Sequence, residues 1–211
     1  MAFLETHVFS QALEVAVTVN VLLPEPSQGI GLEGAKAQEP PRVMYLLHGY
    51  SDDQSIWMRR TSVERYCAKY NLAVIMPAVN HSYYANELQG ERYWDYVSQE
   101  LPQMMHSMFR LSQAPGTELV AGLSMGGYGA LKCGLRVPQT FSQVISLSGA
   151  LDAADIAINN TVPATRRYWE DVFGPAEDVP GSENDLFAAA TADLRAWISD
   201  HFSTALWKLL V

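Results

Sequence analysis

The segment Gly122-Leu123-Ser124-Met125-Gly126 sets a serine between two glycines, directly after the apolar run 119–121 and before a stretch with helical patterning. A serine hydroxyl attacks a carbonyl only when its oxygen is exposed, a base lies beside it and hydrogen-bond donors await the oxyanion. A sharp turn from strand to helix exposes that oxygen, and glycines are needed because the turn leaves no room for side chains. A serine can also cap a helix, but its place after a buried strand indicates a nucleophile.

A second segment is expected to supply oxyanion donors. His48-Gly49-Tyr50 follows the apolar run 44–47. In enzymes with this kind of turn, one donor is the N–H of the residue after the nucleophile, and the other comes from a loop after an earlier strand. The sequence therefore predicts that the N–H groups of Met125 and Tyr50 form the oxyanion hole. We expect His48 to shape this loop, because the usual chain order places the base after the serine and the acid.

The base is less well marked than the nucleophile. His201 is the only histidine after Ser124, so it is the candidate base. The other interpretation is that His201 is an ordinary residue of an amphipathic helix. Asp193 and Asp200 are weaker candidates for the acid, and Asp200 adjoins His201, where neighbours on a helix do not face each other. The four earlier histidines, His7, His48, His81 and His106, are expected at the surface, in loops or in helix packing.

Alternating strands and helices must position these groups. Residues 7–23 predict one or two antiparallel edge strands, and 27–41 predict an exposed loop. Short apolar runs typical of strands buried on both faces occur at 43–47, 72–76, 118–121 and 141–147, with helical patterns at 62–70, 94–109 and 126–137. The sequence predicts an α/β protein with a mostly parallel sheet, helices on both faces and ligands at the carboxyl ends of the strands. Aligned methionines in 94–109 are expected to fill core.

Length and composition exclude several classes of function. The chain has 211 residues, 48% of them hydrophobic, and a formal net charge of -9. This predicts a single domain over 1–211 with a packed core. The acidity leaves no basic face for a nucleic acid partner. No apolar stretch is long enough to span a membrane, and the first residues do not resemble a signal peptide, so we expect a cytoplasmic protein.

The cysteine and histidine pattern predicts neither a disulfide nor a metal site. Cys67 and Cys133 are the only cysteines, and both fall in predicted helices, where we expect them to be reduced and buried. No spacing of cysteine or histidine matches a metal-ligand pattern. A metal site is therefore not expected.

Several motifs taken together resemble those of the esterase D group, which contains the S-formylglutathione hydrolases and, nearest to this chain, the bacterial tributyrin esterases. The motifs, spread over residues 5–190, are Tyr45-Leu46-Leu47-His48-Gly49, Trp57 with Arg59-Arg60-Thr61, Tyr93-Trp94-Asp95-Tyr96, the run 121–130 and the run 146–151. The resemblance implies an α/β-hydrolase fold that hydrolyses short acyl esters through an acyl-enzyme on Ser124, without cofactor. It also implies that Tyr168 to Gly174 form a variable region over the site. For Trp57 and the cluster 93–96 we favour packing over substrate contact.

The end of the sequence departs from this family. An acid and a base on two further strand–helix units would need about 60 residues, whereas 26 remain from Leu186 to Val211. We therefore expect the last strands of the fold to be missing and 191–211 to form an atypical helical tail. An uncovered sheet edge would then pair with a second copy or lie under that tail. Three functions stay open: an ester hydrolase acting on a small molecule, a catalytically impaired binding protein, and an acyltransferase.

Overall fold

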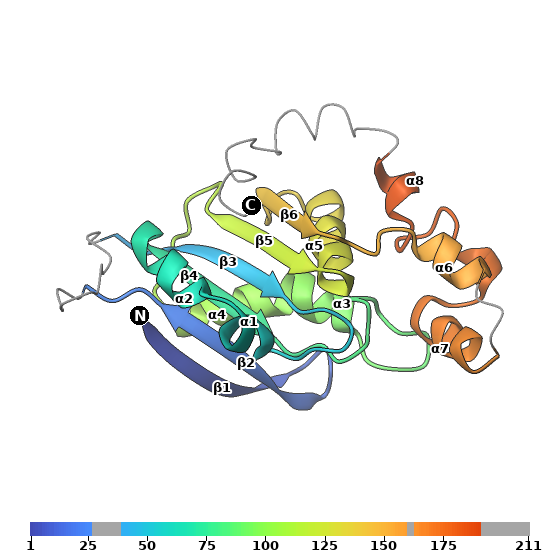
Figure 1. Ribbon diagram of the computed structural model, residues 1–211, viewed down its shortest axis with the longest axis horizontal. Helices are drawn as coiled ribbons and strands as arrows, with labels where there is room; N and C mark the ends of the chain where they lie inside the picture. The colour runs from blue at the N-terminus through green and yellow to red at the C-terminus, as the bar shows by residue number, and fades with distance from the viewer. Residues whose placement is uncertain (27–38, 160–162, 191–211) are drawn as a thin grey trace.

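The computed structural model describes residues 1–26, 39–159 and 163–190 (Figure 1). The predicted helical tail at 191–211, with Asp193, Asp200 and His201, lies outside the described residues. So does most of the predicted loop, at 27–38.

A six-stranded sheet forms the centre of the molecule, in the order β1-β2-β4-β3-β5-β6. The strands are β1 (Ala2–Ser10), β2 (Val15–Leu23), β3 (Arg42–Leu47), β4 (Leu72–Pro77), β5 (Glu118–Leu123) and β6 (Gln143–Leu147). β1 pairs antiparallel with β2, and β2 with β4, whereas β4, β3, β5 and β6 run parallel. The prediction of antiparallel edge strands followed by a parallel sheet is confirmed.

Helices cover both faces of this sheet, as predicted. Each face of the sheet carries its own hydrophobic core, one larger than the other. Side chains of β3 alternate between them: Val43, Tyr45 and Leu47 belong to the larger core, and Met44 and Leu46 to the smaller. The larger core includes side chains of α4 (Leu101–Met108) and α5 (Met125–Arg136), and the smaller includes side chains of α1 (Ile56–Arg60) and α2 (Val63–Cys67). This period of two follows from the pleat, which sends successive side chains to opposite faces.

The helix predicted over 94–109 is divided into α3 (Tyr93–Asp95), a π-helical turn η2 (Tyr96–Glu100) and α4. Pro102 explains the break, because proline lacks an N–H and its ring crowds the carbonyl four residues earlier. Met105 is fully buried and Met104 is partly buried, which fits core filling, but Met108 is 48% exposed.

The remaining helices are η1 (Ala68–Tyr70), α6 (Ala153–Asn159), α7 (Pro163–Phe173), η3 (Ala176–Asp178) and α8 (Leu186–Ala190). α6 and α7 lie beyond the carboxyl ends of β3 and β5 (Figure 1). In the part of the chain that the structure describes, the sheet ends at β6, and no helix is both long and apolar enough to cross a membrane.

Candidate active site

Ser124 stands at the turn between β5 and α5 in a strained backbone conformation, with φ of 56° and ψ of −115°. Such a conformation costs a non-glycine residue on the order of 1–3 kcal/mol, so the surrounding structure must impose it. The Ser124 N–H donates to the Leu147 carbonyl at 2.9 Å, and its carbonyl accepts from the N–H groups of Tyr128 at 3.0 Å and Ala150 at 3.2 Å. The Ser124 side chain makes no capping hydrogen bond to α5, which removes the helix-cap interpretation.

The two glycines of the motif are required by backbone contacts. A Cβ on Gly122 would lie 2.2 Å from the Gly126 carbonyl oxygen, and a Cβ on Gly126 would lie 2.4 Å from that of Leu47. Backbone atoms cannot move aside as a flexible side chain can. The turn at residues 122–126, called the elbow below, is therefore packed closely against the end of β3. This packing places Ser124 beside the loop that follows β3.

That loop, which begins at His48 and is called the oxyanion loop below, carries one of the two predicted donors, the N–H of Tyr50. The other predicted donor, the N–H of Met125, stands at the start of α5. An ideal Cβ on Gly49 would lie 3.8 Å from the Ser124 Cβ, so the loop adjoins Ser124. Among the described residues, the N–H groups of Tyr50 and Met125 have no hydrogen-bond acceptor. Both are thus free to bind an oxyanion.

His48 is a structural part of the same loop. It is 1% exposed; its Nε2 accepts from the Val79 N–H at 3.1 Å, and its Nδ1 lies 2.8 Å from the Gly49 carbonyl oxygen. These two bonds assign the proton to Nδ1, which donates to Gly49. Burial lowers the pKa of His48, with the Gly49 hydrogen bond and the charges of Asp52 and Asp53 acting in the opposite direction. The neutral ring therefore fastens the loop to the end of β4, as predicted.

A buried network of hydrogen bonds, which the sequence did not predict, holds the oxyanion loop in place. The Tyr84 hydroxyl donates to the His48 carbonyl at 2.9 Å. The Tyr84 carbonyl accepts from Lys132 Nζ at 3.3 Å, and Lys132 also donates to Asn184 Oδ1 at 2.7 Å and lies 4.5 Å from the Trp94 ring centre. Burial lowers the pKa of Lys132 to about 8, against the opposing effect of Glu183. The signal was a lysine between Leu131 and Cys133, in the middle of a helix whose other charged residue, Arg136, is its last.

An aromatic cluster joins the loop to α7. The Tyr50 ring stacks on His81 at 4.3 Å and meets Tyr168 edge-on at 5.8 Å, while the Tyr168 hydroxyl donates to the His81 carbonyl. Tyr83 contacts Trp169 at 4.9 Å. The segment predicted as a variable region, Tyr168 to Gly174, therefore packs against the oxyanion loop.

The sequence favours packing over substrate contact for Trp57 and the aromatic cluster 93–96, and these side chains do pack in the two cores. Tyr93, Trp94 and Tyr96 are buried in the larger core. Trp57 packs against the smaller core and donates its Nε1–H to the Leu47 carbonyl at 3.1 Å.

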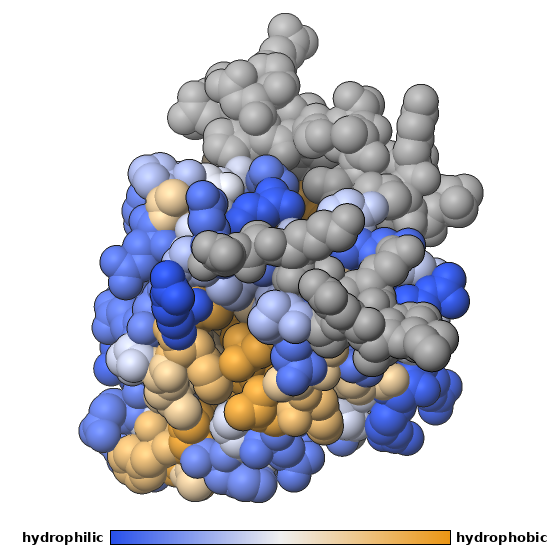
Figure 2. All heavy atoms as spheres, turned by 90° about the vertical axis from the view of Figure 1, so that its left-hand side faces the viewer, coloured by the Kyte–Doolittle hydropathy of each residue, from blue (hydrophilic) through white to orange (hydrophobic). Residues whose placement is uncertain are grey.

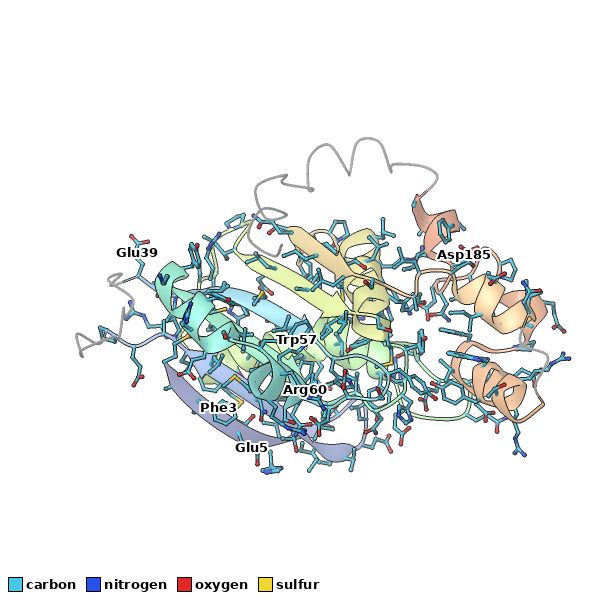
Figure 3. The ribbon with its side chains drawn as sticks, viewed as in Figure 1. Phe3, Glu5, Glu39, Trp57, Arg60 and Asp185 are labelled. Atoms are coloured by element: carbon cyan, nitrogen blue, oxygen red, sulfur yellow. The ribbon has the colours of Figure 1, made fainter. Side chains whose placement is uncertain are left out.

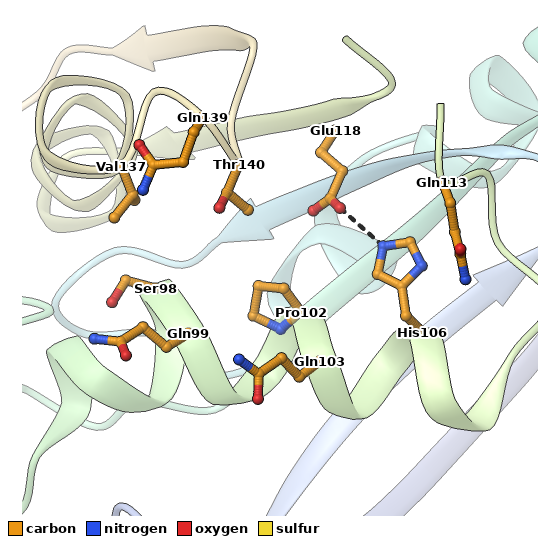
Figure 4. Close-up of a pocket in the computed structure, with 10 residues that line it drawn as sticks. All are labelled: Ser98, Gln99, Pro102, Gln103, His106, Gln113, Glu118, Val137, Gln139 and Thr140. Carbon is orange, nitrogen blue, oxygen red and sulfur yellow. Dashed lines mark hydrogen bonds and ion pairs between the residues drawn. The ribbon is translucent and has the colours of Figure 1, made fainter. Parts of the chain in front are cut away.

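The described histidines do not provide a base for Ser124. No hydrogen bond joins the Ser124 hydroxyl to a histidine or carboxylate within residues 1–26, 39–159 and 163–190. His106 binds Glu118 at 2.8 Å beside a cavity of about 610 Å³ (Figure 4). Glu118 begins β5 and Ser124 follows its end, so this cavity lies at the opposite end of that strand. His7 is on β1 and His81 is exposed.

Among the described residues, no group of three or more potential metal ligands occurs, and Cys67 and Cys133 are free and buried.

The strand order, the strained serine and the two free N–H groups define a serine hydrolase of the α/β-hydrolase class. The family model described as "Putative esterase" matches residues 10–207, so the chain belongs to this esterase family and is a carboxylic ester hydrolase.

Relatives and solved structures agree. An acetyl esterase of Caldicellulosiruptor saccharolyticus is 30% identical over 90% of this chain and 74% of its own length. The fluorophosphonate-binding serine hydrolase F of Staphylococcus aureus is 32% identical, with a TM-score of 0.78 over 92% of this chain and 74% of that one. The S-formylglutathione hydrolase of the same organism is also 32% identical, with a TM-score of 0.73 over 94% and 74%. The resemblance stated from the motifs is confirmed.

Proposed function

We propose that the protein hydrolyses short acyl esters of small molecules through an acyl-enzyme on Ser124. The Ser124 oxygen attacks the ester carbonyl carbon, the carbonyl oxygen becomes an oxyanion held by the N–H groups of Tyr50 and Met125, and the alcohol leaves. Water then hydrolyses the acyl-enzyme. The strained backbone of Ser124 carries the proposal, because a serine is held at φ of 56° only where the structure imposes it.

We propose His201 as the base that takes the Ser124 proton and passes it to the departing alcohol. Its support is chain order alone, since it is the only histidine after the nucleophile. Asp193 and Asp200 stay the candidate acids.

Hydrolysis of p-nitrophenyl acetate tests both assignments. We expect Ser124→Ala and His201→Ala each to lower kcat by at least about 1,000-fold, because members of a catalytic triad act as one unit. His7→Ala is the control, since this histidine is exposed on the edge strand β1 and precedes the nucleophile. Activity unchanged in Ser124→Ala would refute the enzyme mechanism. Activity unchanged in His201→Ala alone would refute only the base.

The same assay tests the alternative of a catalytically impaired binding protein. A site with an oxyanion hole but no working triad keeps roughly 10³–10⁴-fold catalysis over water. A rate of that size, equal in wild type and His201→Ala, would favour this candidate. Formation of a new ester when an alcohol is added would instead favour the acyltransferase.

We further propose that the protein works in the cytoplasm and that residues 1–211 form one domain. The two free, buried cysteines support a reducing compartment. Fractionation of cells that express the protein tests its location.

A further inference from the structure

A small cavity of about 70 Å³ lies beside the predicted oxyanion loop. Its lining comes from that loop, from α1 and from the residue before the nucleophile: Gly49, Asp52, Ile56, Trp57, Arg60, Thr61 and Leu123. Trp57 and Arg60 both come from α1 (Figure 3).

Two of the lining residues flank the reaction centre. An ideal Cβ on Gly49 would lie 3.5 Å from the Leu123 carbonyl oxygen and 3.8 Å from the Ser124 Cβ. The Leu123 side chain is 40% exposed although it belongs to a buried strand. The cavity is therefore next to the carbonyl that Ser124 would attack.

The size of the cavity fits part of a ligand. Sites for whole small molecules are usually about 300–1,000 Å³, whereas 70 Å³ holds roughly five water-sized groups. A short aliphatic chain has about that bulk. The Ile56, Trp57 and Leu123 side chains give it apolar walls, and Asp52 and Arg60 add one charge of each sign to its lining.

We propose that this cavity holds the acyl chain of the ester and that Ile56 and Trp57 limit its length. This inference rests on the proposed function of Ser124. It assigns to α1 the selection of acyl length, with a preference for chains of up to about five carbons beyond the carbonyl.

Sheet order decides which half of the ester enters the cavity. The leaving alcohol must lie beside the base, and in this fold the base comes from chain that follows the nucleophile. After Ser124 the chain passes through α5 to β6, which lies on the opposite side of β5 from β3. The cavity lies on the β3 side, against α1. The alcohol therefore faces β6, and the acyl chain faces α1.

The wall at Trp57 is rigid, whereas Ile56 is the position to vary. Trp57 is held by its hydrogen bond to the Leu47 carbonyl and by packing on the smaller core. Ile56 begins α1 and is only half-buried, so a change there leaves the elbow and the oxyanion loop in place.

Kinetics with p-nitrophenyl esters from acetate to octanoate test the proposal. In the wild type, kcat/KM should rise about fourfold per methylene until the cavity is full, then stop rising. Ile56→Phe should move that limit to shorter acyl groups while acetate hydrolysis is kept, and Ile56→Ala should move it to longer ones. Met58→Ala is the matched control, because Met58 lies on the same helix but packs on the smaller core without lining the cavity. Met58→Ala should change kcat/KM by the same factor for every ester in the series.

Two results would overturn the proposal. One is an Ile56→Phe profile parallel to that of the wild type. The other is an effect of Ile56→Phe that follows alcohol length in a series of alkyl acetates, which would place the alcohol in the cavity.

A binding measurement separates this inference from the proposed function. If the protein hydrolyses no ester, the function of Ser124 fails, but butyrate should still shift the Ile56 methyl resonances in Ser124→Ala. The Met58 methyl should not respond. Absence of any Ile56 shift at saturating butyrate would then refute the acyl cavity itself.

Discussion

At the scale of single residues, His48 shows how burial assigns a role to an ionisable group. Both of its ring nitrogens are used by the backbone, one as donor to Gly49 and one as acceptor from Val79. Protonation would remove the acceptor and place a charge in a site that is almost closed to solvent. The loop that carries Tyr50 is therefore held by a ring that must stay neutral.

We predict that this ring makes stability fall at acidic pH. The folded pKa of His48 is lowered from its ordinary value of 6.5, so below that pH the unfolded chain takes up a proton that the folded protein does not. Its stabilising contribution is thus present above pH 6.5 and is lost as pH falls toward the lowered folded pKa. Urea unfolding at neutral and acidic pH should show a smaller loss for His48→Gln, which keeps a donor and an acceptor but does not titrate. Parallel pH dependence in the two proteins would contradict this.

At the scale of elements, the oxyanion loop, α5 and the segment around Asn184 are held together by polar groups inside the core. Tyr84 contacts the loop through its hydroxyl and Lys132 through its carbonyl. The Tyr84 ring also packs on α5, since a Cβ on Gly129 would lie 2.4 Å from a ring carbon. Loss of one of these hydrogen bonds would leave a buried polar group without a partner, which lowers the free energy of unfolding. Each member of the network therefore supports the position of the others.

Tyr84→Phe should therefore affect both stability and catalysis. The lost hydroxyl leaves the buried His48 carbonyl without its partner, which costs about 1–3 kcal/mol of unfolding free energy. A small shift of the oxyanion loop should also lower kcat about tenfold, because misplacement of catalytic groups by a fraction of an ångström is expensive. Tyr66→Phe is the control, since Tyr66 is 58% exposed. A loss of stability with kcat unchanged would show that the bond serves folding alone.

At the scale of the whole molecule, the two edges of the sheet differ. β1 exposes Phe3 and Phe9, but the exposed residues between them on the same strand face are Glu5 and His7, whose charge and polarity oppose strand pairing. Figure 2 views the molecule from the side on which the N-terminus lies in Figure 1, and apolar residues gather in the lower part of that face. At the other end, no strand among the described residues pairs with the outer edge of β6.

We predict that the β6 edge is covered, by a second copy or by the C-terminal residues. Sedimentation velocity should show a mass that rises with concentration in the first case. In the second case the protein stays a monomer, and the outward amides of β6 exchange slowly with deuterium. A monomer whose outward β6 amides exchange freely would refute both.

Local patterns in the sequence determined the strand order along the chain, the Gly-x-Ser-x-Gly turn, the loop with Tyr50 and the structural role of His48. These follow from short-range rules, because burial on both faces leaves apolar runs and a tight turn requires glycine. The π-helical turn before Pro102 also had a local cause, which the helical periodicity of 94–109 concealed.

Only the tertiary structure decided which distant groups meet. Lys132 reaches Tyr84 and Asn184 across 48 and 52 residues of sequence. Ile56 and Leu123 share a cavity because β3 and β5 are neighbours in the sheet, although 70 residues, His48 to Thr117, lie between the end of β3 and the start of β5 along the chain. Such contacts depend on sheet order and on side-chain direction. Neither is written in the residues that lie next to each other in the sequence.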